Sequence, residues 1–327
     1  MSRRSLQTPR PVSEPVSPRV QDLGGLFLLD TQHMGYSGTV GVYLLPGAAG
    51  TFALIESGPG STLETVLAGV QEAGFAPEKL TNVLVTHIHL DHAGAAGTLA
   101  QRYGAQVFVH ENGAGHLVEP SRLLASAGRI YGDRMDELWG GMDPLPQHLL
   151  RPVRDGETVE ILGHRLGVLY TPGHASHHVS YLLAKTRLFT GDAAGIRLPG
   201  AATVRPALPP PELDLELWSR SVQAMRQAEP DELLLTHFGR VDEVAGHFRD
   251  LEHQHRVWSE SILEGMNAGE DDEALAARVT ALSRASLLAE GASDETIARH
   301  SVSSSDAMTV TGVKRYWQKV HPERLER

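Results

Sequence analysis

The sequence predicts an α/β protein with a helical region at its C-terminus. Short apolar runs bounded by glycine and proline recur between residues 26 and 236, as expected for strands, and helical patterns separate several of them. Beyond Val241 the patterns are helical only. A content of 41% hydrophobic and 21% charged residues over 327 positions is that of a globular protein with a sizeable core.

The individual elements follow from these patterns. Strands are predicted at residues 26–30, 39–45, 51–57, 82–85, 106–110, 157–162, 164–170, 179–184, 187–190 and 232–236. Helices are predicted at residues 61–73, 98–103, 213–228, 241–266, 271–288, 293–299 and 310–319. Ser61 with Glu64 reads as a capping box for the first of these helices. Residues 112–147 have weak periodicity and predict short helices and loops, either a core insertion or a cover over a substrate.

This pattern divides the chain into three parts. Residues 1–20, rich in arginine, serine and proline, are expected to form a flexible arm. Residues 21–240 are expected to form the main α/β domain, and residues 241–327 a helical region whose role in capping a site, partner binding or self-association is left open. There is no apolar run of membrane-span length and no apolar secretory core, so a cytoplasmic protein is expected.

Charge and cysteine content narrow the chemistry. A net charge of −11 argues against a general nucleic-acid binder, which usually has a basic face. The absence of cysteine excludes disulfides, a thiol nucleophile, cysteine-ligated zinc and iron–sulfur clusters. A bound metal must therefore be held by histidine and carboxylate groups, and the chain contains 17 histidines.

The segment from Thr86 to Gly94 carries the strongest chemical signal. It reads Thr-His-Ile-His-Leu-Asp-His-Ala-Gly and directly follows a predicted buried strand. Four possible ligands occur within six residues, namely His87, His89, Asp91 and His92. Imidazole and carboxylate ligands suit zinc, iron or manganese.

Three later strands each end on another candidate ligand, namely His174, Asp192 and His237. Two metal ions need two ligand sets with a shared bridge. The expected sets are His87, His89 and His174 for one metal, and Asp91, His92 and His237 for the other. Asp192, which has two carboxylate oxygens, is the expected bridge. A water between the metals would have its pKa lowered to about 7.

The motifs at residues 86–94, 171–174, 189–192 and 236–237 resemble those of the metallo-β-lactamase-fold superfamily, and within it the glyoxalase II-like hydrolases. The resemblance spans roughly residues 26–239. It implies an αβ/βα four-layer sandwich with the metal site at one edge between the sheets. It also implies hydrolysis by a bridging hydroxide, with two divalent ions, zinc being expected and iron or manganese being alternatives.

Further roles are expected for residues near these motifs. His178 matches a histidine that orients a ligand or loop in this family. Asp91 is also a candidate proton shuttle to the leaving group. The possible substrate-pocket residues are His33, Tyr36, Tyr131, Trp139 and His177, although packing explains the aromatic ones equally well. Arg197 and Arg240 are expected to form surface contacts or salt bridges.

The first functional hypothesis is a dinuclear hydrolase of a small ester, lactone or thioester. The alternative is an iron persulfide dioxygenase of the same superfamily, with one iron on His87, His174 and Asp192. A phosphodiesterase or nuclease is disfavoured by the acidic net charge. A binding module on an inactive fold is disfavoured because every ligand position is filled. A small-molecule substrate is expected, without nucleic acid or membrane, and a homo-oligomer is left open.

Overall fold

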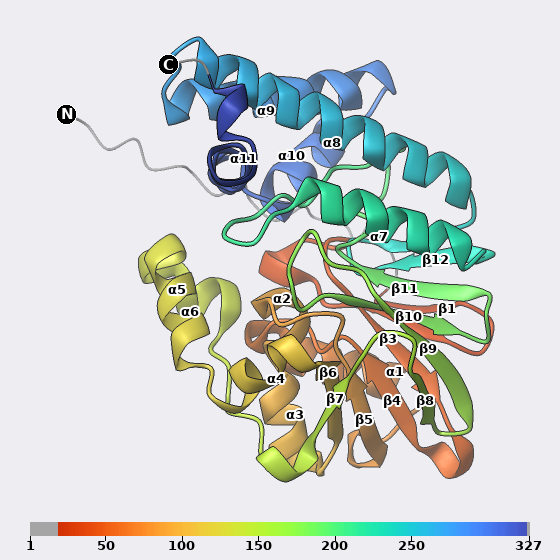
Figure 1. The fold of residues 1–327 in the computed structure, drawn as a ribbon. Helices are drawn as coiled ribbons and strands as arrows, with labels where there is room; N and C mark the ends of the chain where they lie inside the picture. Colours follow the sequence, from red (N-terminus) through yellow and green to blue (C-terminus); the bar gives the residue numbers. More distant parts are fainter. Residues whose placement is uncertain (1–18, 326–327) are drawn as a thin grey trace.

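The computed structural model describes residues 19–325, which form two facing β-sheets with helices on both outer sides (Figure 1). One sheet has seven strands in the order β1-β2-β3-β4-β5-β6-β7, and the other has six in the order β13-β12-β11-β10-β9-β8. The predicted four-layer αβ/βα sandwich with a C-terminal helical extension is therefore confirmed. The predicted N-terminal arm lies outside the described residues except for its last two positions. None of the described helices is long and apolar enough to cross a bilayer.

The first half of the chain builds the larger sheet and its helices. The strands are β1 (Val20–Asp22), β2 (Phe27–Asp30), β3 (Gly41–Pro46), β4 (Phe52–Ile55), β5 (Leu80–Leu84), β6 (Gln106–His110) and β7 (Leu150–Val153). The helices are α1 (Leu63–Glu72), α2 (Leu90–Ala93), α3 (Ala96–Tyr103), α4 (Glu111–Val118), α5 (Ser121–Tyr131) and α6 (Met135–Trp139). The edge strands β1 and β7 escaped prediction because they are short, partly exposed and, in β7, interrupted by Pro152.

The second half builds the smaller sheet and the helical region. The strands are β8 (Thr158–Ile161), β9 (His164–Tyr170), β10 (Val179–Leu183), β11 (Arg187–Gly191), β12 (Glu232–Leu235) and β13 (Gly239–Val241). The helices are α7 (Leu215–Gln227), α8 (Val244–Asn267), α9 (Asp272–Ala289), α10 (Asp294–Ser303) and α11 (Asp306–Val320). The three-residue strand β13 also escaped prediction, because it is too short to show an alternating pattern.

The C-terminal helices share one hydrophobic core with the sandwich. The buried cluster between the sheets includes Tyr43 and Phe189, whose rings meet edge to face at 5.2 Å. The same cluster continues through Trp218 on α7 to Trp258 on α8 and Val313 on α11. Figure 1 shows these helices lying together over the outer side of the smaller sheet. The helical region is thus packed onto the sandwich.

The predicted capping box at the start of α1 is wrong. The side chain of Thr62, at the helix N-cap, makes no capping hydrogen bond. The Ser61 hydroxyl instead donates to the carbonyl oxygen of Leu138 at 2.8 Å. This bond fixes α6 against the turn that precedes α1, because a serine side chain serves a distant backbone group as readily as its own helix.

The directions of the strands place the polar residues that follow several of them at one edge of the sandwich. β4 is parallel to β5, and β11 is parallel to β12. β9 runs in the direction of β11, because both are antiparallel to β10. The two sheets meet at this edge, where the amide of Val179 donates to the carbonyl of Thr86 and the amide of Gly41 to the carbonyl of Thr236, both at 2.8 Å. Side chains following β4, β5, β9, β11 and β12 therefore converge.

Candidate metal centre

All seven predicted ligand residues lie at this edge of the sandwich. The residues that follow β5 supply four of them, and the ends of β9, β11 and β12 supply one each. Three groups of side chains place their ligand atoms within 4.8 Å of one another, namely His87, His89 and His174; His87, His92 and Asp192; and Asp91, His92 and His237. The first and the last of these are the two ligand sets expected from the sequence, and we name them the first and the second ligand group. The set of His87, His92 and Asp192 joins them through Asp192.

In the first group three imidazole nitrogens converge. Nδ1 of His89 lies 2.9 Å from Nε2 of His87 and 2.9 Å from Nε2 of His174. The Nδ1 atom of His174 donates to the carbonyl oxygen of Ala207 at 2.9 Å, which leaves its Nε2 unprotonated in the neutral ring. The Thr86 hydroxyl donates to a carboxylate, so it can only accept from Nδ1 of His87. Two nitrogen lone pairs therefore point at the same place.

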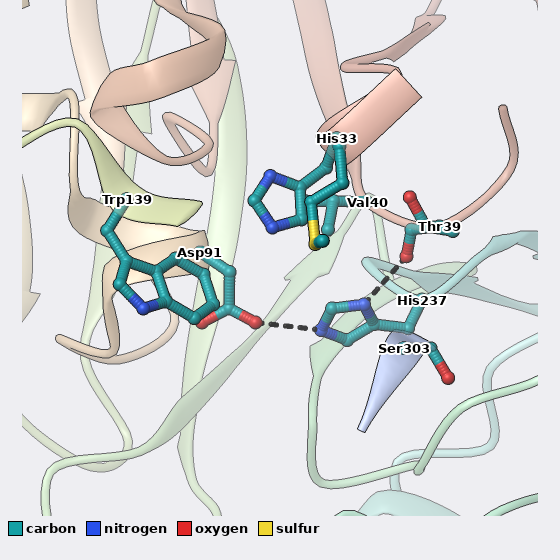
Figure 2. Close-up of a pocket in the computed structure, with 8 residues that line it drawn as sticks. His33, Thr39, Val40, Asp91, Trp139, His237 and Ser303 are labelled. Carbon is teal, nitrogen blue, oxygen red and sulfur yellow. Dashed lines mark hydrogen bonds and ion pairs between the residues drawn. The ribbon is translucent and has the colours of Figure 1, made fainter. Parts of the chain in front are cut away.

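Hydrogen bonds to neighbouring residues also orient the imidazole rings of the second ligand group. Nδ1 of His237 lies 2.7 Å from the carbonyl oxygen of Thr39, and Nδ1 of His92 lies 2.9 Å from a carboxylate oxygen of Glu56. Such contacts hold each ring with Nε2 toward the site. Nε2 of His237 is 3.4 Å from Asp91 Oδ2 (Figure 2). Nε2 of His92 is buried and faces a carboxylate oxygen of Asp192 at 3.2 Å.

Asp192 stands between the two groups and presents one oxygen to each. Its Oδ2 lies 3.3 Å from Nε2 of His174, in the first group. Its Oδ1 lies 3.2 Å from Nε2 of His92 and 3.3 Å from Nε2 of His237, in the second group. Burial alone would raise the pKa of Asp192, but these three histidines outweigh burial and hold that pKa well below its usual range. The carboxylate is therefore ionised.

Gly191 and His178 fix the position of Asp192. Gly191 has a φ of +49°, and a Cβ there would come within 2.3 Å of Thr86 Oγ1 and 2.6 Å of His178 Nε2. Only glycine fits this approach. The Asp192 amide donates to His178 Nε2 at 3.1 Å, so the proton of that ring is on Nδ1, which donates to the Thr171 hydroxyl at 2.8 Å. His178 thus orients the loop that carries Asp192.

The residues present fit divalent metal ions. Histidine nitrogens and carboxylate oxygens form a borderline donor set, and the buried Oδ1 of Asp192 faces the Nε2 atoms of His92 and His237 at 3.2 and 3.3 Å. Burial lowers the pKa of His237, but the carboxylates of Asp192 and Asp91 outweigh burial and raise it to about 10. These carboxylates therefore favour a positive charge between them, and a metal ion supplies that charge in place of protons.

Glu56 is a buried residue beside the ligand cluster that the sequence pattern did not single out. It follows β4, is 1% exposed and has a φ of +68°. Its carboxylate accepts hydrogen bonds from the amide and hydroxyl of Thr86, from the Thr236 hydroxyl and from Nδ1 of His92. One buried side chain thereby connects the ends of β4, β5 and β12. The available signal was a charged residue placed directly after a buried strand, as at the ligand positions.

A small cavity opens beside the second ligand group. Its volume is about 40 Å³, and its lining residues are His33, Met34, Thr39, Val40, Asp91, Trp139, His237 and Ser303 (Figure 2). Burial is the main cause that lowers the pKa of His33 to about 4, so this ring is neutral at pH 7. Ser303, at the end of α10, shows that the helical region contributes to the wall of the site.

The other predicted pocket residues, Tyr36, Tyr131 and His177, are not among the residues that line this cavity. Tyr36 is buried in the loop that follows His33. Tyr131 packs edge to face against Trp139 at 5.1 Å, and His177 stacks on His87 at 6.0 Å. Arg240 forms ion pairs with Glu232 and Asp242 and, like Arg197, does not line the cavity, in keeping with the expected surface or salt-bridge role for Arg240.

Comparisons with known proteins identify related chains and structures. The metallo-β-lactamase-fold protein ST1585 of Sulfurisphaera tokodaii is 33% identical over 168 residues, covering 50% of this chain and 62% of that protein. The crystal structure of ST1585 from Sulfolobus tokodaii matches with a TM-score of 0.57 and 28% identity, covering 70% of this chain and 85% of that chain. The metallo-β-lactamase family protein TTHA1429 of Thermus thermophilus matches with a TM-score of 0.66 over 91% of this chain and 94% of that one.

At 24% identity, the likeness to TTHA1429 concerns the fold alone. This chain spans about 62% of the length of ST1585, and the glyoxalase II-like branch stays a prediction. The profile of the metallo-β-lactamase superfamily matches residues 38–237, which hold all seven candidate ligands. Because that match covers more than half of the sequence, the chain belongs to the metallo-β-lactamase superfamily, whose members are typically metal-dependent hydrolases.

Proposed function

We propose that this chain is a dinuclear metal-dependent hydrolase that acts on a small ester, lactone or thioester. The observation that supports this proposal best is the position of Asp192. Its two oxygens face two separate sets of ligand atoms, at 3.3 Å from His174 and at 3.2 and 3.3 Å from His92 and His237. A carboxylate placed in this way suits a bridge between two metal ions.

The reaction adds the hydroxyl group of one water to the acyl carbon, breaks the bond to the leaving oxygen or sulfur, and returns a proton to that atom. Divalent metal ions, when bound, lower the pKa of water toward 7 and polarise a carbonyl group. Asp91 is suited to move the proton, because its carboxylate touches the second ligand group and also lines the cavity. Asp91 is 22% exposed, whereas Asp192 is 7% exposed, so Asp91 is the carboxylate within reach of a leaving group.

The competing function is the iron persulfide dioxygenase, for which His87, His174 and Asp192 would hold a single iron. That iron would use two residues of the first ligand group and Asp192. The convergence of Asp91, His92 and His237, whose ligand atoms lie within 4.8 Å of one another, therefore favours the hydrolase. A phosphodiesterase is disfavoured because no lysine or arginine occurs among the described residues that line the cavity. A phosphodiester is an anion and is usually bound by such cations.

The test compares wild type with Asp192→Asn on phenyl acetate, γ-butyrolactone, S-phenyl thioacetate and bis(4-nitrophenyl) phosphate, after loading with zinc. Asp242→Asn is the matched control, because Asp242 is an exposed aspartate on the Arg240 ion pair. We expect hydrolysis of the ester, lactone or thioester by wild type and by the control, and a loss of roughly 100-fold in kcat/KM in Asp192→Asn.

Undiminished hydrolysis in Asp192→Asn would contradict the bridging role. Oxygen uptake with glutathione persulfide by protein carrying one iron, without hydrolysis of any probe, would replace the hydrolase with the dioxygenase.

A further inference from the structure

The cavity beside Asp91 contains two buried polar atoms that nothing in the described part of the chain satisfies. They are Nδ1 of His33 and the indole Nε1 of Trp139. His33 is 9% exposed, and both rings line the cavity. Figure 2 shows them beside the Asp91 carboxylate, with His237 on its other side. Buried polar groups in native proteins nearly always have a partner, so a pair without one in a cavity points to a ligand.

The loop that carries His33 is held in a strained conformation. Gln32 and Met34, on either side of His33, have φ values of 52° and 55°, which non-glycine residues rarely adopt. The buried carboxylate of Asp30 holds this loop by accepting hydrogen bonds from the amides of Gln32 and Gly38. Strain of this kind persists where the surrounding structure enforces it, typically at a binding site.

Trp139 is held just as firmly from a different part of the chain. The Ser61 hydroxyl donates to the carbonyl of Leu138, one residue before it. Gly140, one residue after it, packs so closely on Ser61 that a Cβ there would come within 2.4 Å of the Ser61 amide nitrogen. The indole ring stacks on His33 with centroids 5.3 Å apart and planes at 20°. The two rings therefore form one preorganised surface, which we name the His33–Trp139 pair.

The remaining lining residues define the chemistry of the ligand. The Thr39 carbonyl is occupied by His237, and the Ser303 hydroxyl donates to the carbonyl of His300. Met34 and Val40 are apolar, and no lysine or arginine occurs among the described residues of the lining. Such surroundings disfavour an anionic group. They suit an uncharged group that has an oxygen to accept a hydrogen bond from the indole N–H.

Size adds a further restriction. The volume of about 40 Å³ corresponds to a few water molecules and thus to a few non-hydrogen atoms. Because the cavity adjoins Asp91, the group bound there lies beside the proposed proton shuttle.

We propose that the His33–Trp139 pair binds the small, uncharged, oxygen-bearing portion of the substrate beside Asp91 and so determines which esters or lactones are accepted. This inference rests on the proposed hydrolase function. Its consequence is specificity for compact neutral substrates over those with a carboxylate or phosphate at this position.

The test uses acetamide, a compact neutral probe that the zinc-loaded protein is not expected to cleave. The full chain is labelled with ¹⁵N, and the indole N–H signals of its four tryptophans are recorded during titration. Trp139→Phe identifies the Trp139 signal by its loss. We expect that signal alone to shift and to saturate at a dissociation constant on the order of millimolar, as suits so small a ligand.

His33→Phe keeps a flat ring for stacking and removes the ring nitrogens. We expect it to weaken acetamide binding roughly three- to tenfold, the loss of one hydrogen bond. It should also raise the KM for methyl acetate by a similar factor while leaving kcat within about twofold, as loss of a binding contact does. His148→Asn is the matched control, because His148 is exposed and does not line the cavity.

The outcomes separate this inference from the proposed function. Hydrolysis with no acetamide-dependent shift of the Trp139 signal would overturn the pocket and leave the hydrolase intact. A saturable shift that His33→Phe weakens, in protein that hydrolyses none of the probes, would support the pocket as a ligand site and overturn the hydrolase. Equal acetamide affinity in wild type and folded His33→Phe would overturn the role of His33.

Discussion

The ligand cluster and the cavity wall adjoin each other, yet they are built in different ways. Four of the seven ligand residues come from one nine-residue segment, and internal hydrogen bonds to backbone carbonyls or Glu56 hold several of their rings. The cavity wall comes from three distant segments, represented by His33, Trp139 and Ser303. The comparison teaches that local motifs supply the chemistry, whereas long-range packing shapes the space where a substrate must fit.

The largest expected effect concerns the ligand cluster. Glu56→Ala would leave the Thr86 amide, the Thr236 hydroxyl and Nδ1 of His92 buried without their acceptor. Removing one partner from a buried polar network typically costs 3–5 kcal/mol, so we expect the free energy of unfolding to fall by about 4 kcal/mol. Zinc affinity should also fall roughly 10- to 100-fold.

Urea denaturation and a competitive zinc chelator measure these two quantities. Glu64→Ala is the control, since Glu64 is an exposed glutamate whose pairing with Arg102 is at the surface. A Glu56→Ala protein with wild-type stability and zinc affinity would show that the cluster does not depend on this carboxylate.

The next effect concerns the cavity wall. Arg205 is 2% exposed, forms an ion pair with Asp306 at 2.6 Å and donates to the carbonyls of His300 and Ser304. It therefore holds the link between α10 and α11 that places Ser303 at the cavity. We expect Arg205→Leu to lower the free energy of unfolding by about 3 kcal/mol. The number of zinc ions bound per chain of this variant should stay at the wild-type value, as measured by elemental mass spectrometry.

Arg226→Leu is the comparison variant, because the Arg226–Glu252 pair is about one-third exposed and should contribute about 1 kcal/mol or less. Loss of bound zinc in Arg205→Leu but not in Arg226→Leu would contradict the expectation that the cavity wall can be destabilised without disturbing the ligand cluster.

The sequence predicts the ligand cluster much better than it predicts the cavity wall. The Thr86–Gly94 motif and the single ligands at later strand ends were recognisable because each follows a buried strand. Glu56 escaped attention because its role depends on contacts with β5 and β12 that no local pattern reveals. The contribution of Ser303 to the site could not be predicted, because it depends on how the helical region packs.

Local patterns also misled in one place. Ser61 stands where a capping box would place its serine, but its hydroxyl donates a hydrogen bond to the Leu138 carbonyl 77 positions away. Strands β1, β7 and β13 were missed because short edge strands owe their existence to a neighbouring strand and not to their own periodicity. For Ser61 and for these three strands, contacts with distant parts of the chain determined the local structure.

A smaller, pH-dependent effect is expected from His255, behind the first ligand group. Burial is the main cause that lowers its pKa to about 3, so the ring is neutral when folded and protonates near pH 6.5 when unfolded. Acid therefore favours the unfolded chain, and stability is lost as pH falls from about 6.5 toward 3, by up to about 1.4 kcal/mol per pH unit.

We expect His255→Phe to reduce this slope, measured by urea denaturation at pH 7, 6 and 5. His253→Phe, on the exposed position two residues earlier, should keep the wild-type slope. Identical slopes in wild type and His255→Phe would contradict the buried neutral state of His255.

The smallest effect is expected at Tyr131, whose hydroxyl lies 3.3 Å from the sulfur of Met308 on α11. Because sulfur is a weak acceptor, Tyr131→Phe should change the free energy of unfolding by only about 0.5 kcal/mol or less. Thermal unfolding measures the change. A loss as large as that in Arg205→Leu would mean that this contact, and not the Arg205 ion pair, secures the helical region over the cavity.

The central claim is that Asp192 divides the ligand cluster into two metal positions. The direct test is anomalous X-ray diffraction at the zinc edge from crystals of the zinc-loaded protein. We expect two peaks per chain, one among His87, His89 and His174 and one among Asp91, His92 and His237, with Asp192 between them. A single peak on His87, His174 and Asp192, at saturating zinc, would contradict the two-metal site.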